Sequence, residues 1–148
     1  MDLLSRITDE MKIAMRAKDK PRLGVIRMAL SSIKLVKIDT QKDMSEADIV
    51  ALIVKMIKQR KESVTMFTAG GRVDMAANEQ AEIVVLEEFL PKALTADEVK
   101  QLISAAITES GAASMADMGK VMAILKPQLQ GKADLGQVSG QVRAALNA

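Results

Sequence analysis

The sequence contains no histidine, cysteine, tryptophan or tyrosine among its 148 residues. Without His or Cys, the familiar Ser-His-Asp and Cys-His arrangements of nucleophilic catalysis cannot be built. Two phenylalanines are the whole aromatic content, so few rings are present on which unpaired bases could stack. Any chemistry or binding must therefore come from Lys, Arg, Asp, Glu, Ser, Thr and the backbone.

Long apolar runs are also missing. No uncharged apolar run approaches the roughly 18 residues that a membrane-spanning helix needs. The first residues, "MDLLSRITDEMK", are charged early and lack the apolar centre of a signal peptide. The absence of cysteine fits a reducing compartment. We therefore expect a cytoplasmic protein that does not associate with membranes.

Positive charge is concentrated in one part of the chain, although the net charge is only +2. Residues 12–61 carry 13 Lys and Arg against 5 Asp and Glu, whereas residues 62–148 carry 7 against 11. Clustered positive charge attracts phosphate at long range. We therefore expect an anionic partner for this block, with a solvated helix surface as the alternative.

Apolar residues recur at three- and four-residue steps along nearly the whole chain, which is the period of an amphipathic helix. Pro21 suits the first turn of a second helix, and Gly70-Gly71 suits the end of a third. No segment alternates at period two, so the sequence predicts an all-α fold. The stripe expected in a first helix over residues 3–15 consists of Leu4, Ile7, Met11, Ala14 and Met15.

The composition changes at "PKALTADE", residues 91–98. A fourth helix over about 73–90 ends at Pro91, because proline disrupts a helix interior. Shorter helical segments follow, one of which we expect to end at Pro127. The sequence thus predicts a four-helix N-terminal subdomain over 1–91 and a smaller three-helix C-terminal subdomain over 92–148.

Helix starts are marked by a hydroxyl or carboxyl side chain three residues before a polar side chain that can complete a capping box. Such a pair stabilises the first turn by satisfying amide groups that have no partner inside the helix. The pairs in this sequence are Ser45 with Asp48, Thr95 with Glu98, Ser114 with Asp117, and Asp134 with Gln137.

The glycines of "LQGKADLGQVSG", residues 129–140, raise the question of a nucleotide loop. A P-loop needs two glycines separated by four residues, then Lys and a hydroxyl residue, after a strand. Seven residues separate Gly111 from Gly119, and Ala133 stands where the hydroxyl residue would follow Lys132. The stretch is better explained as a turn between two helices, with Asp134 capping the second.

Other catalytic arrangements are equally incomplete. Ser31 and Lys34 have the spacing of S-x-x-K acyl-transfer enzymes, but the accompanying S-D-N and K-T-G elements are missing. A carboxylate-bridged di-metal bundle needs Glu-x-x-His, and the chain has no histidine. The acidic pairs Glu79 with Glu82 and Glu87 with Glu88 are therefore expected to be solvated helix surface. We expect no catalytic residue, no metal and no cofactor.

The basic residues give a stronger signal. Lys20, Arg27 and Lys34 recur every seven residues and share a helix face. Lys58 and Lys61 add to this charge in the third helix, where an i,i+4 pair of Lys58 with Glu62 would compensate part of it. Arg60 interrupts the apolar face of the same helix. It either packs its stem and reaches a carboxylate such as Glu87 or Glu88, or orders a loop or a phosphate.

Three stretches together resemble the YqeY family, whose members are similar to the C-terminal tail region of the GatB subunit of the tRNA-dependent amidotransferase. They are "RLGVIRMALSSIK", "IKQRKESVTMFTAGGRVDMAANEQAEIVVLEEFLPKAL" and "GAASMADMGKVMAILKPQLQGKAD". The resemblance covers about residues 5–147. Two positions depart from the family habit: Leu135 stands where glycine is usual, and Phe89 where tyrosine is more common.

The resemblance implies a four-helix part followed by a three-helix part. In the amidotransferase the tail grips tRNA, whereas the chemistry belongs to other parts of the enzyme that this chain does not contain. The resemblance therefore implies binding of tRNA or another structured RNA without catalysis. The alternatives are a protein-interaction module that docks on a synthetase or amidotransferase, and a glutamine-dependent carbon–nitrogen ligase activity.

The RNA hypothesis specifies the contacts. Because no DNA-reading helix-turn-helix pattern is present, we expect recognition of phosphates and shape, without DNA specificity. The expected electrostatic contacts come from two helices, and the turn after the sixth helix is expected to approach a phosphate. The candidate residues are Arg27, Lys34, Lys58, Lys61, Gly131 and Lys132.

Overall fold

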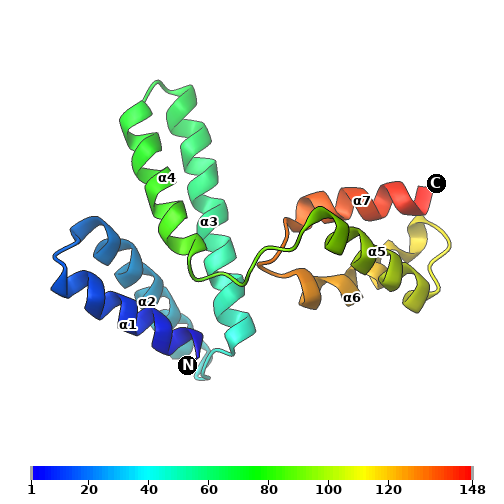
Figure 1. Cartoon of the computed structure of the whole chain (residues 1–148), viewed down its shortest axis with the longest axis horizontal. Helices are drawn as coiled ribbons and strands as arrows, with labels where there is room; N and C mark the ends of the chain where they lie inside the picture. The colour runs from blue at the N-terminus through cyan, green and yellow to red at the C-terminus, as the bar shows by residue number, and fades with distance from the viewer. Residues whose placement is uncertain (1, 148) are drawn as a thin grey trace. The chain divides into compact units, whose positions relative to one another are not determined.

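The computed structural model describes residues 2–147, which form seven α-helices, one short 3-10 helix and no strand (Figure 1). The all-α prediction is confirmed. The chain divides into two compact units, Met1–Leu90 and Pro91–Ala148, here called unit 1 and unit 2. The predicted division into a subdomain over 1–91 and a subdomain over 92–148 stays a prediction. Among the described residues, no helix combines the length and the apolar character needed to cross a membrane.

Unit 1 consists of two helix pairs (Figure 1). Helices α1 (Leu3–Arg16) and α2 (Lys20–Thr40) form the first pair, and α3 (Glu46–Ala69) and α4 (Val73–Glu87) form the second. Each pair folds back through a turn of only a few residues, which favours antiparallel packing. Helix α4 ends three residues earlier than predicted.

The turns of unit 1 follow the local sequence signals. Pro21 lies in the first turn of α2, as predicted. Gly70 ends α3, and Gly71 adopts a left-handed φ of +74°, which glycine tolerates without steric cost. The capping box of α3 is complete: the Asp48 amide donates to Ser45 Oγ at 3.1 Å, and the Ser45 amide donates to Asp48 Oδ2 at 3.1 Å.

The core of unit 1 lies between its four helices. Each helix contributes at least one side chain that is nearly or fully buried: Ile7, Ile26, Ile53, Ile83 and Leu86. The predicted stripe of the first helix is partly wrong, because Leu3 is buried while Leu4 and Met15 are 42% and 46% exposed. A hydrogen bond from the Leu3 amide to Glu46 Oε1, 2.9 Å long, ties the start of α1 to α3.

Unit 2 packs three helices around a smaller core. Helix α5 spans Ala96–Ser110, the 3-10 turn η1 spans Met115–Asp117, α6 spans Met118–Leu129 and α7 spans Leu135–Asn147. Gly111 ends α5 with a left-handed φ of +69°, which glycine adopts without steric cost. The buried residues of this core are Val99, Ile103, Ala106, Val121, Leu125, Leu129, Val138 and Val142.

Three local predictions in unit 2 need correction. Thr95 caps α5 by accepting the Glu98 amide at 3.2 Å, but only this half of the capping box forms. Ser114 makes no cap; Asp117 instead accepts the Ala113 amide at 3.0 Å, because η1 precedes the α-helix. Pro127 lies inside the last turn of α6. Burial of the neighbouring Leu125 and Leu129 holds that turn although proline donates no hydrogen bond.

Candidate nucleic-acid interface

Helix α2 presents two of the predicted contacts, Arg27 and Lys34. Both side chains are exposed, and neither takes part in an ion pair within residues 2–147. Their spacing of seven residues places them on one side of α2, since two helical turns take about seven residues. This part of the predicted basic surface is therefore available to an anionic ligand.

Helix α3 presents the other two, Lys58 and Lys61, on a different face. Both are exposed, and within the described part of the chain neither forms an ion pair. The predicted pairing of Lys58 with Glu62 does not appear among those ion pairs. Successive helical residues are rotated by about 100°, so both lysines project about 140–160° away from the buried Met56. The four predicted contacts thus form two separate sets.

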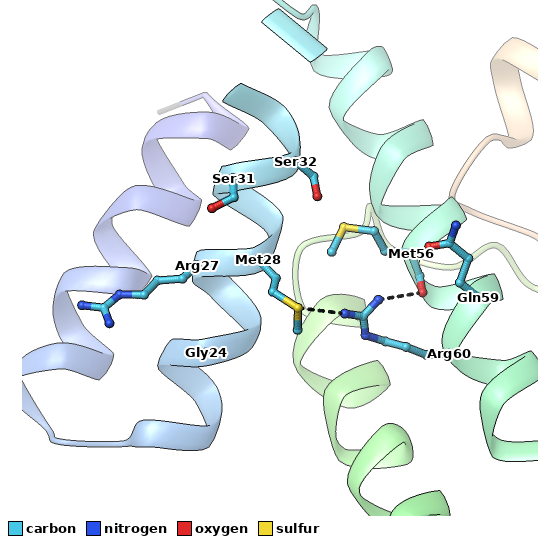
Figure 2. A pocket seen from close by; sticks show the side chains of 8 residues that line it. All are labelled: Gly24, Arg27, Met28, Ser31, Ser32, Met56, Gln59 and Arg60. Atoms are coloured by element: carbon cyan, nitrogen blue, oxygen red, sulfur yellow. Dashed lines mark hydrogen bonds between the residues drawn. The ribbon is translucent and has the colours of Figure 1, made fainter. Parts of the chain in front are cut away.

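Arg60 has a structural role. Its Nε donates to Glu82 Oε2 at 2.9 Å and its Nη1 to the Met56 carbonyl at 3.1 Å, while Nη2 lies 3.7 Å from Met28 Sδ (Figure 2). The side chain is only 12% exposed. The prediction of a carboxylate partner is confirmed, but the partner is Glu82 on α4 rather than Glu87 or Glu88.

A second arginine network, which the sequence analysis missed, joins the two helix pairs. Arg22 on α2 donates to Glu10 Oε2 on α1 at 3.1 Å and to the carboxylate of Glu88 just after α4. The hydrogen bond to Glu88 raises the pKa of the Arg22 guanidinium, and Glu10 adds to this effect. Arg6 donates to the Glu88 carbonyl and lies 5.5 Å from the centre of the Phe89 ring. These contacts hold together residues that are far apart in sequence.

The acidic side chains of the basic block are mostly engaged elsewhere. Asp19 caps α2 and Asp48 completes the capping box of α3. Glu46 accepts the Leu3 amide, and Asp43 pairs with Lys37 at 2.7 Å. Three of the five carboxylates in residues 12–61 therefore accept backbone amides and a fourth pairs with Lys37, so no ion pair within residues 2–147 involves the four predicted basic contacts of α2 and α3.

Two surface hollows lie along α2. The first, here called the α2–α3 groove, has a volume of about 450 Å³ (Figure 2). Figure 2 shows Met28 and Ser32 directed towards α3, whereas the Arg27 head lies on the other side of α2. The second hollow, of about 630 Å³, surrounds the end of α2 and includes Lys34, Ile38 and Lys42.

The Gly131–Lys132 turn is built from internal hydrogen bonds. Gly131 has a left-handed φ of +77°. The Lys132 amide donates to the Leu129 carbonyl at 2.9 Å, and the Lys132 carbonyl accepts the Leu94 amide at 2.9 Å. Within unit 2, the main chain of Lys132 therefore ties the segment before α5 to the turn between α6 and α7, and the half-buried Lys132 side chain has no ion-pair partner in residues 2–147.

Asp134 caps α7, as predicted. Its Oδ1 accepts the amides of Gly136 and Gln137 at 2.8 and 3.3 Å. A Cβ atom on Gly136 would lie 3.1 Å from this same oxygen, which explains a glycine at 136. The amides that the N-terminus of a helix would offer to an anion are thus partly occupied by a side chain of the chain itself.

Neither of the two catalytic arrangements considered in the sequence, the di-metal carboxylate site and the Ser31–Lys34 pair, is formed within residues 2–147. In residues 2–147, no three Asp or Glu side chains gather in a group that could hold a metal ion. Ser31 and Lys34 are both exposed, and no hydrogen bond joins their side chains. The fold and site together define an all-α protein of two helical units that presents unpaired basic side chains on two faces of unit 1.

The chain belongs to the YqeY family: the family described as "Yqey-like protein" matches residues 4–146. This match confirms the resemblance found in the sequence. It covers both units, so the unpaired basic residues and the Gly131–Lys132 turn all lie inside the family region.

Curated relatives carry the name "Altered inheritance of mitochondria protein 41, mitochondrial". The relative from Lachancea thermotolerans is 36% identical over 101 residues, which cover 68% of this chain and 54% of the relative. The relative from Kluyveromyces lactis is 37% identical over 90 residues, covering 60% and 49%. The relative from Saccharomyces cerevisiae is 32% identical over 115 residues, covering 73% and 62%. The chain thus spans about half to three-fifths of the length of these relatives.

These names overturn one expectation. We expected a cytoplasmic protein from the sequence. The names of the relatives contradict this expectation, because they describe mitochondrial proteins. The expectation rested on the absence of cysteine, of a long apolar run and of a signal-peptide pattern in the first residues. None of these absences distinguishes the cytosol from another reducing compartment.

Proposed function

We propose that this chain is a non-catalytic helical module that binds tRNA, or complexes that carry tRNA, through phosphate and shape contacts. The observation that carries the proposal is the uncompensated positive charge of α2 and α3. Four of the five carboxylates in residues 12–61 are engaged in caps, a backbone contact or the single pair with Lys37. Exposed ammonium and guanidinium groups without such partners are suited to phosphate contacts that release counterions.

Three places in the chain supply the proposed contacts. Arg27 and Lys34 act from α2, and Lys58 and Lys61 act from α3, on a separate face. A folded RNA is large enough to touch both faces, and it is read mainly through phosphates and 2′-hydroxyls. Gly131 allows the turn that presents the Lys132 side chain, which supplies a further charge contact.

Binding of unmodified tRNA at increasing salt concentration tests this function. We expect log K to fall linearly with log salt, because each phosphate contact releases counterions. Lys58→Ala is expected to reduce that slope by about one unit. Fluorescence anisotropy of labelled tRNA measures both quantities. No detectable binding at low salt would contradict the proposal.

A second candidate function is docking on a partner protein, such as a synthetase or an amidotransferase. The specific observation that favours it is the exposure of large apolar side chains in unit 1, among them Leu35 at 59% and Ile38 at 60%. Exposed apolar surface is a feature of protein contacts. Affinity capture from a lysate with and without ribonuclease separates the two candidates, because a direct protein contact survives loss of the RNA. No observation favours a ligase activity of this chain alone, and we do not propose one.

A further inference from the structure

Helix α2 has an outer face that is neither purely basic nor purely polar. Its members are all exposed. With about 100° between successive residues, they fall within an arc of about 120° along about four helical turns. The α2 outer face consists of Gly24, Arg27, Met28, Ser31, Lys34, Leu35 and Ile38.

The apolar part of this face is larger than phosphate binding requires. Met28 is 42% exposed, Leu35 is 59% exposed and Ile38 is 60% exposed. The spacing of these residues gives a continuous stripe on one side of the helix. Phosphate and ribose cannot cover such a stripe, whereas the apolar face of another helix can.

Small residues lie in the middle of the stripe. Gly24 and Ser31 are seven residues apart, so they share one side of α2. A Cβ atom added to Gly24 would meet no atom within 4 Å, which means that this space is not filled by the chain itself. Small side chains at such a spacing let another helix backbone approach closely. Bulky side chains would suit a lipid surface better.

Basic side chains line one edge of the same face. Arg27 and Lys34 lie about 100–120° from Met28 around the helix axis, and neither has an ion-pair partner within the described residues. The two hollows that follow α2 extend the surface along most of the helix. The ligand that fits is therefore elongated, apolar on one side and negatively charged along one edge.

We infer that the α2 outer face docks an acidic amphipathic helix of a partner protein. Apolar side chains of the partner cover Met28, Leu35 and Ile38, and its carboxylates meet Arg27 and Lys34. A second copy of this chain does not fit, because a two-fold contact through this face would place the same basic edge against itself.

This inference rests on the second candidate function, docking on a partner protein, which it deepens, and it adds a relation to RNA binding. Arg27 and Lys34 serve both the proposed phosphate contacts and the partner carboxylates, so the acidic helix and RNA compete on α2. Lys58 and Lys61 lie on another face of α3 and take part only in RNA binding. The two functions can therefore be separated by substitution.

A synthetic helical peptide of about 18 residues, with leucines along one face and glutamates elsewhere, serves as the probe for the full chain. We expect it to bind, and the double variant Leu35→Ser/Ile38→Ser to weaken binding about tenfold or more. The matched control is Met66→Ser/Val84→Ser, which removes two exposed apolar side chains from α3 and α4 and should leave peptide binding unchanged. A peptide with lysine in place of glutamate should not bind.

Four outcomes would overturn the inference. The first is that the acidic peptide does not bind, and the second is that a peptide with scrambled leucine positions binds equally well. The third is that both double variants lose peptide affinity equally. The fourth is that the unsubstituted chain binds vesicles with anionic lipid and the Leu35→Ser/Ile38→Ser variant does not. The RNA function is judged separately, because Leu35→Ser/Ile38→Ser keeps every charge. If that variant lowered tRNA affinity as strongly as peptide affinity, RNA rather than a helix would be the ligand of this stripe.

Discussion

Unit 1 and unit 2 differ in the apolar side chains that they leave in solvent. Of the eleven large apolar side chains that are exposed in residues 2–147, ten belong to unit 1 and only Met115 belongs to unit 2. Their net charges do not differ, since residues 1–90 carry 15 basic and 14 acidic side chains and residues 91–148 carry 6 and 5. The comparison shows that the exposed large apolar side chains of the described residues gather in unit 1, and that the charge asymmetry of unit 1 is internal, between its basic second helix and its acidic fourth.

The two units also use charge differently in packing. Unit 1 joins separate helices through Arg22 with Glu10 and Glu88, and through Arg60 with Glu82. In the described part of unit 2, the one ion pair is local, between Lys120 and Asp117 three residues apart, at 3.7 Å. Unit 2 is therefore held by its apolar core and its helix caps, whereas unit 1 adds long-range polar contacts to its core.

The largest effect is expected from a cavity in the smaller core. Leu125 is fully buried in unit 2, and Leu125→Ala should lower the free energy of unfolding of that unit by about 2–5 kcal/mol. Hydrogen exchange resolved by segment measures the stability of each unit. Protection of α5 to α7 should fall while protection of α1 to α4 is retained. Equal losses in both units would contradict their treatment as separately stable parts.

A smaller effect is expected from the long-range polar contacts of unit 1. Arg60→Ala leaves Glu82 and the Met56 carbonyl without a partner, and should lower the free energy of unfolding by about 1–3 kcal/mol. Its neighbour Lys61 is exposed, so Lys61→Ala should change that quantity by less than about 0.5 kcal/mol. Urea denaturation measures both. Similar values for the two variants would show that the Arg60 contacts do not stabilise unit 1.

The smallest effect compares one helical glycine from each unit. Gly24 in α2 and Gly140 in α7 are exposed, and no atom lies within 4 Å of a Cβ added to either. Each change to alanine should raise the free energy of unfolding by about 0.5–1 kcal/mol. Leucine at the same two positions tests the docking surface. Gly24→Leu should block binding of the acidic peptide and Gly140→Leu should not, because only Gly24 lies on the α2 outer face. A loss of stability in Gly24→Ala would mean that α2 requires glycine for its own packing.

Local features of the fold could be predicted from the sequence, because their causes lie within a few residues. The capping box of Ser45 with Asp48 and the left-handed Gly111 depend on neighbouring backbone groups alone. Asp134 was predicted as a cap for the same reason. Ser114 was predicted wrongly, because a 3-10 turn precedes α6 and moves the accepting carboxylate to Asp117.

Features that depend on pairing between helices could not be predicted. Which carboxylate meets Arg60 is decided by the packing of α3 against α4, and the partner is Glu82 rather than Glu87 or Glu88. In the same way, the position of α1 determines which of its first residues is buried, and that residue is Leu3 rather than Leu4. The candidate contacts were chosen by charge, but their separation into an α2 set and an α3 set required the helix orientations. Whether these residues bind RNA stays a prediction.

The most direct test of the RNA proposal compares two variants that lose the same charge. One removes the proposed contacts of unit 1, Arg27→Ala/Lys34→Ala/Lys58→Ala/Lys61→Ala. The other removes four exposed basic side chains of unit 2, Lys92→Ala/Lys100→Ala/Lys126→Ala/Arg143→Ala.

Binding of tRNA by both variants is measured as a function of salt concentration. We predict that the unit 1 variant loses most of the affinity and of the salt dependence, while the unit 2 variant keeps a slope close to that of the unsubstituted chain. Equal losses in the two variants would contradict the account, because they would show that tRNA responds to net charge rather than to the faces of α2 and α3.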